Sequence, residues 1–329
     1  MQLIYVEKNL IEHPRVKTII NRFKHKTVIE CDHYNEVFNR KQQSFRQQKN
    51  NPALILAEKK GRKVLPTPEN FGPSTHRNFY FSHLLNCPFD CRYCFLQGLY
   101  SSAHYVLFVN YEDFFTEIEQ TLLTEKKPCM FFSGYDADSM AYDPISGFID
   151  AFVPFFQSHP TATLELRTKS ANLKALLRHT ASDNIIVAAS LTPEPISSAV
   201  EHKVPSLIKR LRALQQAAEH GYPIGLRLDP LIDGDNFTQL YSTLINTIST
   251  HLQPQQIHSV SLGPLRFPKK MHSKIIKMHP QDTLLNQRLQ QKDGIISYSD
   301  QRQITMECIT RDLLSNLTTS DKIFSCVHT

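Results

Sequence analysis

Three cysteines, Cys87, Cys91 and Cys94, follow one another at the spacing C-x3-C-x2-C and have the clearest capacity for chemistry in this chain. They come soon after a short apolar run at Asn78–Ser82, which predicts a strand ending just before the cysteine loop. Closed iron–sulfur clusters and structural zinc sites usually take four protein ligands, so three cysteines leave one metal position open. We interpret the loop as the ligand set of a [4Fe-4S] cluster. A zinc site with a distant fourth ligand, or three unrelated core cysteines, are the alternatives.

The cysteine spacing, with an aromatic residue before the last cysteine (Tyr93) and another after it (Phe95), resembles the signature of the radical SAM superfamily. The resemblance implies two cofactors: a [4Fe-4S] cluster on the three cysteines, and S-adenosylmethionine (SAM), which binds at the open iron and is reduced there. We expect Tyr93 and Phe95 to contact these cofactors. The resemblance also implies an electron donor such as flavodoxin or ferredoxin.

The composition is that of an ordinary globular protein. The chain has 329 residues, of which 41% are apolar and 21% charged, enough for one large α/β domain and an appendage. No stretch approaches the roughly 20 apolar residues of a membrane span, and the N-terminus lacks a secretory pattern. The clustered cysteines need reduced thiolates, so we expect a cytoplasmic protein without a membrane contact. The formal charge of +6 is by itself weak evidence for a polyanionic partner.

From residue 78 onward, short apolar runs alternate with amphipathic helical patterns. The predicted strands are 78–82, 129–133, 163–168, 185–190, 224–228 and 259–262, and the predicted helices are 111–126, 145–156, 171–179, 205–220 and 236–252. Strands joined by helical crossovers imply a parallel sheet, and six are too few to close an eight-stranded barrel. We therefore predict an α/β fold with an open (β/α)6 partial TIM barrel of the radical SAM type at 71–265. A basic N-terminal extension at 1–70 and a C-terminal extension at 266–329, a possible DNA contact, complete the chain.

Polar side chains stand at the ends of the predicted strands, where parallel sheets place their ligands. We assign Lys169 to the carboxylate of SAM and Ser190 to its ribose or amino-acid part; helix capping or a surface salt bridge is the alternative for each. Arg227 and Asp229 end the fifth strand and are a candidate structural pair.

Two basic segments flank the core. Residues 40–63 carry eight lysines and arginines against one glutamate, and residues 266–272 carry Arg266, Lys269, Lys270 and His272. Both fit a surface for nucleic-acid phosphates. A solvated loop and helix face is the alternative for the first segment.

Over most of its length the chain also resembles the spore photoproduct lyase family. The segments that carry this likeness are Ile4–Glu7, Cys94–Gln97, Tyr105–Asp113, Arg167–Lys169, Ser190–Thr192 and the run from Arg266. The resemblance implies a DNA-repair carbon–carbon lyase. Such an enzyme uses a 5′-deoxyadenosyl radical to abstract hydrogen from a flipped-out thymine dimer, so DNA or a nucleotide-like substrate is the expected partner.

The chain departs from that family at two positions. In the family, a cysteine after the second strand returns a hydrogen atom to the thymine radical; Tyr135 stands there in this chain. Phe95 stands where the family usually has tyrosine, whereas Tyr93 is retained. We therefore interpret Tyr135 and Tyr93 as candidate catalytic residues. Two alternatives stay open: a radical SAM paralogue acting on another substrate, and a non-catalytic nucleic-acid-binding protein with a structural metal site.

Overall fold

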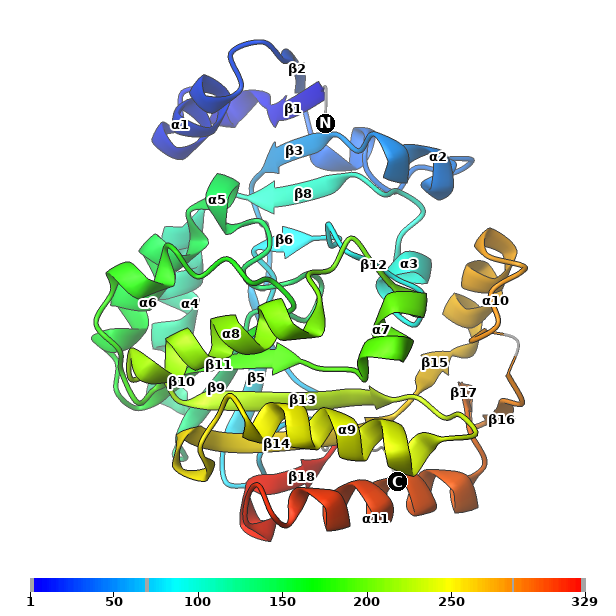
Figure 1. Ribbon diagram of the computed structural model, residues 1–329. Coiled ribbons are helices and arrows are strands. Elements are labelled where there is room, and N and C mark those ends of the chain that lie inside the picture. Colours follow the sequence, from blue (N-terminus) through cyan, green and yellow to red (C-terminus); the bar gives the residue numbers. More distant parts are fainter. Residues whose placement is uncertain (1–2, 69–70, 286, 327–329) are drawn as a thin grey trace.

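The computed structural model describes residues 3–68, 71–285 and 287–326, and its main feature is an eight-stranded sheet curled into a half-barrel (Figure 1). The strands lie in the order β18-β14-β13-β11-β10-β9-β5-β4. Their bounds are β4 Val64–Pro66, β5 Arg77–Phe81, β9 Cys129–Phe132, β10 Ala162–Thr168, β11 Ile185–Ser190, β13 Ile224–Leu231, β14 Ile257–Pro264 and β18 Ile323–Ser325. Neighbouring strands are parallel except that β4 runs antiparallel to β5. The predicted open partial barrel is confirmed.

All six predicted strands are present, and the sheet contains one further parallel strand. This strand, β18, comes from the C-terminal extension and pairs with β14. One predicted helix, 171–179, is wrong, because only a 3-10 turn at Leu176–Arg178 forms there. The Ser170 and Asn172 side chains accept backbone N–H groups two residues further on, at 3.1 and 3.2 Å, and such local bonds compete with helix formation.

Helices cover the outer face of the half-barrel and bury its main core (Figure 1). They are α4 Tyr111–Thr124, α6 Phe148–Gln157, α8 Leu207–Glu219, α9 Phe237–Ser249 and α11 Asp300–Leu314. The short helix α5 Asp143–Ser146 lies next to strand β8 (Tyr105–Phe108), and α7 Glu194–Val200 lies at the arrowhead end of the sheet (Figure 1). The predicted helix 145–156 is divided at Gly147, whose φ of 61° lies in the left-handed region that glycine tolerates. Alternate strand residues point to opposite faces. On β9, for example, Phe131 joins the main core while Met130 and Phe132 join a small cluster with Tyr80 and Phe71.

A second sheet, with the order β2-β1-β3-β8-β6, lies beside the half-barrel. Its strands are β1 Leu3–Glu7, β2 Thr27–Cys31, β3 Leu54–Ala57, β6 Leu84–Leu85 and β8 Tyr105–Phe108, and helix α1 Pro14–Arg22 packs against it. Because β6 and β8 follow residue 70, the first 70 residues do not form this sheet alone.

The remaining elements are short and surround the cysteine loop or the chain ends. They are β7 Asp90–Cys91, β12 Glu201–His202, α2 Phe45–Asn50, α3 Leu96–Leu99, β15 Arg266–Pro268, α10 Lys269–Met278, β16 Gln290–Lys292 and β17 Ile295–Ser297, with 3-10 turns at Lys8–Leu10, Tyr34–Glu36, Pro254–Gln256 and Ser320–Lys322. None of the helices in the described part of the chain has the length and apolar character that crossing a bilayer requires.

Candidate active site at the carboxyl ends of the strands

The cysteine loop lies between β6 and α3 and is held from two sides. On one side β7 pairs antiparallel with β12, so Cys91 lies opposite Glu201. On the other side the ammonium of Lys49 donates hydrogen bonds to the carbonyls of Cys87 at 2.8 Å and Phe89 at 3.0 Å. The loop is therefore a fixed part of the fold.

The three thiols of the loop are reduced and lie close enough to act on one another electrostatically. Burial raises the pKa of Cys91 to about 12, and it also raises the pKa of Cys87 and of Cys94. The negative charge of a neighbouring thiolate raises the pKa of Cys87 and Cys91 further. Three such thiolates ionise together only beside a compensating positive charge, and a metal centre supplies one.

The loop fits a cluster better than a single metal ion. Within residues 3–68, 71–285 and 287–326, no group of three or more histidine, cysteine, aspartate or glutamate side chains is arranged to hold one ion. A [4Fe-4S] cluster takes each thiolate at a different iron, so its ligands need not converge on one point. Cys87, Cys91 and Cys94 are the residues that would hold it.

Glu201 connects the cysteine loop to the ends of the sheet. Its side chain is buried, with 6% of the residue exposed, and accepts a hydrogen bond from the Tyr93 hydroxyl. Lys169, just beyond β10, lies 3.4 Å from the same carboxylate, and its ammonium stands 5.5 Å from the centre of the Tyr93 ring. The structure therefore brings together two residues that the sequence assigned separately, Tyr93 and Lys169.

Three further groups complete the contacts of the Glu201 carboxylate. Arg210 pairs with it at 2.9 Å, and the hydroxyls of Ser197 and Thr192 donate to it at 2.6 and 3.0 Å. Burial opposes ionisation, but Lys169 and Arg210 together with the hydrogen bonds hold the Glu201 pKa at about 2. Sequence reasoning missed Glu201, because nothing local distinguishes it from the other glutamates of the chain.

Ser190 ends β11 on the concave face of the half-barrel, directly opposite Arg227 in the register of β11 and β13. Arg227 and Asp229 do not pair with each other, so the pairing suggested by the sequence is wrong. Arg227 is fully buried and bonds the equally buried Glu165 at 2.7 Å, whereas Asp229 pairs with Arg266 at 3.3 Å. The concave face is therefore lined with paired charges.

Tyr135 follows β9 and lies in an aromatic cluster next to the cysteine loop. Its ring stacks on Tyr80 with centroids 4.2 Å apart and contacts Phe71 at 5.8 Å and Phe95 at 6.1 Å. Burial, and then the neighbouring Tyr80 and Asp136, raise the Tyr135 pKa, so the phenol keeps its proton at neutral pH. A protonated phenol beside the loop is a group able to give a hydrogen atom.

Three of the eight cations in the first basic segment, Lys49, Lys59 and Lys63, are half-buried. Lys49 is bound to the cysteine loop, Lys59 stands 4.9 Å from the centre of the Phe108 ring, and Lys63 lies 4.0 Å from Asp113. The other five, Arg40, Lys41, Arg46, Lys60 and Arg62, are exposed. The second segment begins with Arg266 in β15 and continues into the first turn of α10.

Comparison with known proteins gives a consistent result. The family model described as spore photoproduct lyase matches residues 1–322. The curated spore photoproduct lyase of Bacillus subtilis (strain 168) is 22% identical over 292 residues, which are 86% of this chain and 83% of that protein. The curated spore photoproduct lyase of Clostridium acetobutylicum is 22% identical over 209 residues, 63% of this chain and 62% of that protein.

Solved structures show the same fold. A spore photoproduct lyase double mutant with bound AdoMet and dinucleoside spore photoproduct has a TM-score of 0.84 at 18% identity, covering 100% of this chain and 98% of that chain. A spore photoproduct lyase complexed with the dinucleoside spore photoproduct has a TM-score of 0.84 at 17% identity, with the same coverage.

Proposed function

Because the chain belongs to the spore photoproduct lyase family, we propose that it is a radical SAM lyase that acts on a thymine photoproduct in DNA or on a similar nucleotide-like substrate. The observation that carries this proposal is the cysteine loop, which Lys49 and Glu201 hold at the carboxyl ends of the parallel strands. This is the edge at which such sheets bind their ligands.

Two cofactors follow from the proposal, the [4Fe-4S] cluster and SAM. When bound, the cluster supplies the electron that splits the sulfonium of SAM, which is chemistry that no side chain provides. The chain's own residues then have holding and orienting roles. In this proposal Cys87, Cys91 and Cys94 bind the metal centre, Lys169 binds the carboxylate of SAM, and Ser190 binds its ribose or amino-acid part.

Tyr93 and Glu201 act as positioning residues in this proposal. The Glu201 carboxylate binds both the Tyr93 hydroxyl and the Lys169 ammonium. It therefore fixes the positions of the Tyr93 ring and the Lys169 cation relative to the cysteine loop. Phe95 contributes a second aromatic ring beside the cysteine loop, and this ring carries no hydroxyl. Tyr135 contacts Phe95 and is the group proposed to give a hydrogen atom, from its phenol oxygen, to the substrate.

The second basic segment supports the proposed DNA partner. Lys269 and Lys270 open helix α10 beside Arg266, at the same end of the sheet as the loop. Phosphates of a strand whose lesion is flipped into the half-barrel would meet these side chains. A donor of single electrons such as flavodoxin or ferredoxin is the second proposed partner. The reduced thiols fit a cytoplasmic location.

A second candidate function is a radical SAM paralogue with a different substrate. The residue that favours it is Tyr135, which we interpret as standing in the place of the family's donor cysteine and which has a much larger side chain. One experiment separates the two candidates: 5′-deoxyadenosine and thymine are measured anaerobically with and without dinucleotide that carries the spore photoproduct. Repair predicts that the dinucleotide accelerates SAM cleavage and yields thymine. If the rate of SAM cleavage is the same with and without the dinucleotide, and no thymine forms, the result supports the paralogue.

The third alternative, a non-catalytic protein with a structural metal site, makes a different prediction. Anaerobically purified protein would then be colourless and hold one zinc ion. A brown protein with about four irons per chain supports the enzyme.

A further inference from the structure

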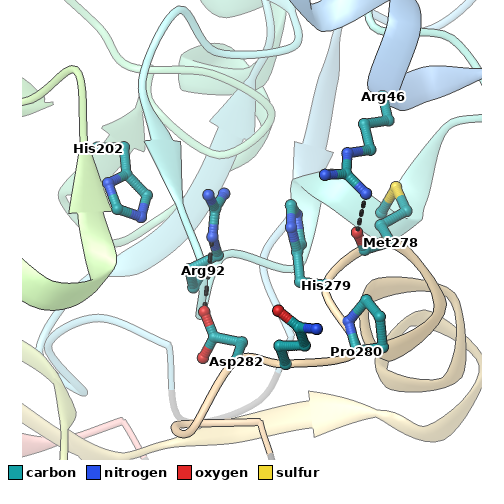
Figure 2. A pocket seen from close by; sticks show the side chains of 8 residues that line it. Arg46, Arg92, His202, Met278, His279, Pro280 and Asp282 are labelled. Carbon is teal, nitrogen blue, oxygen red and sulfur yellow. Dashed lines mark hydrogen bonds and ion pairs between the residues drawn. The ribbon is translucent and has the colours of Figure 1, made fainter.

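Two adjoining pockets of about 440 and 200 Å³ open beside the cysteine loop and share Arg46, Arg92, Met278 and His279. Figure 2 shows the larger pocket, whose side chains come from four separate segments. Arg46 belongs to α2, Arg92 to the cysteine loop and His202 to β12, and His279 directly follows α10. We call the two pockets together the basic groove.

The basic groove lies on the far side of the β7–β12 pair from the proposed SAM site. In an antiparallel pair, directly opposed residues share a face and successive residues alternate between faces. Cys91 and Glu201 are opposed and face Tyr93 and Lys169, so Asp90 and His202, the next opposed pair, face the other way, into the groove. The groove and the thiol of Cys91 therefore lie on opposite faces of the β7–β12 pair.

Several contacts tie the wall of the groove to the loop. Lys49, which lines the smaller pocket, donates to the carbonyls of Cys87 and Phe89. His279 bonds the Gln97 side chain at 2.8 Å, three residues after the last cysteine. A molecule seated in the groove would contact residues bonded directly to the loop.

The groove carries an excess of positive charge. Its lysines and arginines are Arg46, Lys49, Arg92 and Lys203, against the two carboxylates Asp90 and Asp282. Arg92 engages both carboxylates, at 3.2 and 3.5 Å. Arg46 and Lys203 are exposed, and within the described part of the chain neither forms an ion pair. Arg46 donates a hydrogen bond to the Met278 carbonyl at 3.5 Å (Figure 2), but neither positive charge is neutralised by a carboxylate.

The apolar part of the groove suits a protein surface. Phe45, Met278 and Pro280 lie among the arginines, and arginine, methionine and aromatic residues are the types enriched where proteins meet.

We propose that the basic groove is the docking surface for an acidic protein that carries single electrons; this inference rests on the proposed function. Opposite charge accelerates the encounter of two proteins and orients it. Docking here brings the carrier's redox group to the loop that holds the thiols, without occupying the SAM side of the β7–β12 pair. The proposed DNA contact, Lys269 and Lys270, lies in the first turn of α10, whereas the groove is lined by Met278 at the end of that helix and by the residues after it.

Binding of an acidic flavodoxin to the metal-loaded chain tests the proposal directly. At low salt we expect a saturable complex whose dissociation constant rises about tenfold or more for Arg46→Glu and for Lys203→Glu. Lys126→Glu is the matched control, because this exposed lysine lies before β9, at the amino end of the sheet. That variant should bind within about twofold of the unmodified chain, since distant exposed charges are screened.

A second arm separates docking from catalysis. Dithionite needs no docking surface, so Arg46→Glu and Lys203→Glu should keep dithionite-driven 5′-deoxyadenosine formation and lose the flavodoxin-driven reaction. Equal flavodoxin binding by all variants would overturn the proposal. So would variants that lose affinity for an oligonucleotide and keep it for flavodoxin. If the unmodified chain cleaves no SAM with either reductant, the proposed function is wrong. The binding measurement remains a separate test, because it shows whether flavodoxin binds at the groove.

Discussion

The ring of Tyr135 lies 6.1 Å from the ring of Phe95, centroid to centroid. These are the two positions at which we expect the chain to depart from the family pattern. Phe95 follows the last cysteine of the loop, and Tyr135 follows the second strand of the predicted barrel. Their proximity supports the proposal that Tyr135 gives a hydrogen atom to the substrate radical.

Replacing Tyr135 by cysteine tests this placement. A thiol has a weak S–H bond and gives up a hydrogen atom easily. Tyr135→Cys should therefore increase severalfold the amount of thymine that is recovered from the spore photoproduct dinucleotide for each SAM molecule cleaved. Tyr80→Cys is the control, because Tyr80 stacks on Tyr135 at 4.2 Å, whereas the ring contact of Phe95 is with Tyr135. Equal recovery by Tyr135→Cys and the unmodified chain would mean that Tyr135 is not at the donor position.

Lys169→Met tests the proposed contact with the SAM carboxylate. A hydrogen bond to a charged group contributes about 1.5–3 kcal/mol, so the dissociation constant of SAM should rise at least about tenfold. Equilibrium dialysis with the iron-loaded protein measures it, and Lys169→Arg should restore part of the affinity because the positive charge returns. Unchanged SAM affinity with lowered stability would show that Lys169 serves only its ion pair with Glu201.

Glu201→Gln should destabilise the fold strongly. The change leaves Arg210 and Lys169 without their buried countercharge, and removal of one partner of a buried pair costs about 3–5 kcal/mol. Urea unfolding of the variant measures the loss. Glu30→Gln removes an exposed carboxylate and should change stability by less than about 0.5 kcal/mol. A loss below about 1 kcal/mol for Glu201→Gln would contradict the role of this residue as a connection between loop and sheet.

Stability should fall in acid because of two buried glutamates. Glu165 is held at a pKa of about 2 against the effect of burial by Arg227 and Arg167, and Glu201 by Lys169 and Arg210, whereas the ordinary value is 4.5. A folded-state pKa below the unfolded value gives stability that is full above pH 4.5 and is lost as the pH falls toward 2. The free energy of unfolding measured against pH should decline across this window, and less steeply in Glu201→Gln. Equal slopes would contradict the assignment.

The parallel sheet could be predicted from sequence because its strands are buried on both faces. Cys129–Phe132 is apolar throughout and is followed by Ser133, and Ile185–Ser190 is apolar up to its last residue. These two serines mark the site edge. The cysteine spacing is equally local. Fold class and candidate metal ligands therefore followed from short segments.

What the sequence missed depends on contacts between distant segments. The strand Ile323–Ser325 is three residues long and is defined only by its pairing with β14. The sheet that joins Leu3–Glu7 to Tyr105–Phe108 through Leu54–Ala57 combines segments that the sequence placed in separate domains. Glu201 is important only because β12 folds back onto the loop and because Lys169 and Arg210 come from other elements.

Iron content after single replacement of the loop cysteines tests the central claim most directly. Cys87→Ala, Cys91→Ala and Cys94→Ala are each expected to fall well below the about four irons per chain of the unmodified protein and to lose dithionite-driven 5′-deoxyadenosine formation. Cys308→Ala, which removes an exposed thiol of α11, should keep both. A variant of Cys87, Cys91 or Cys94 that retains full iron and full SAM cleavage would contradict the account.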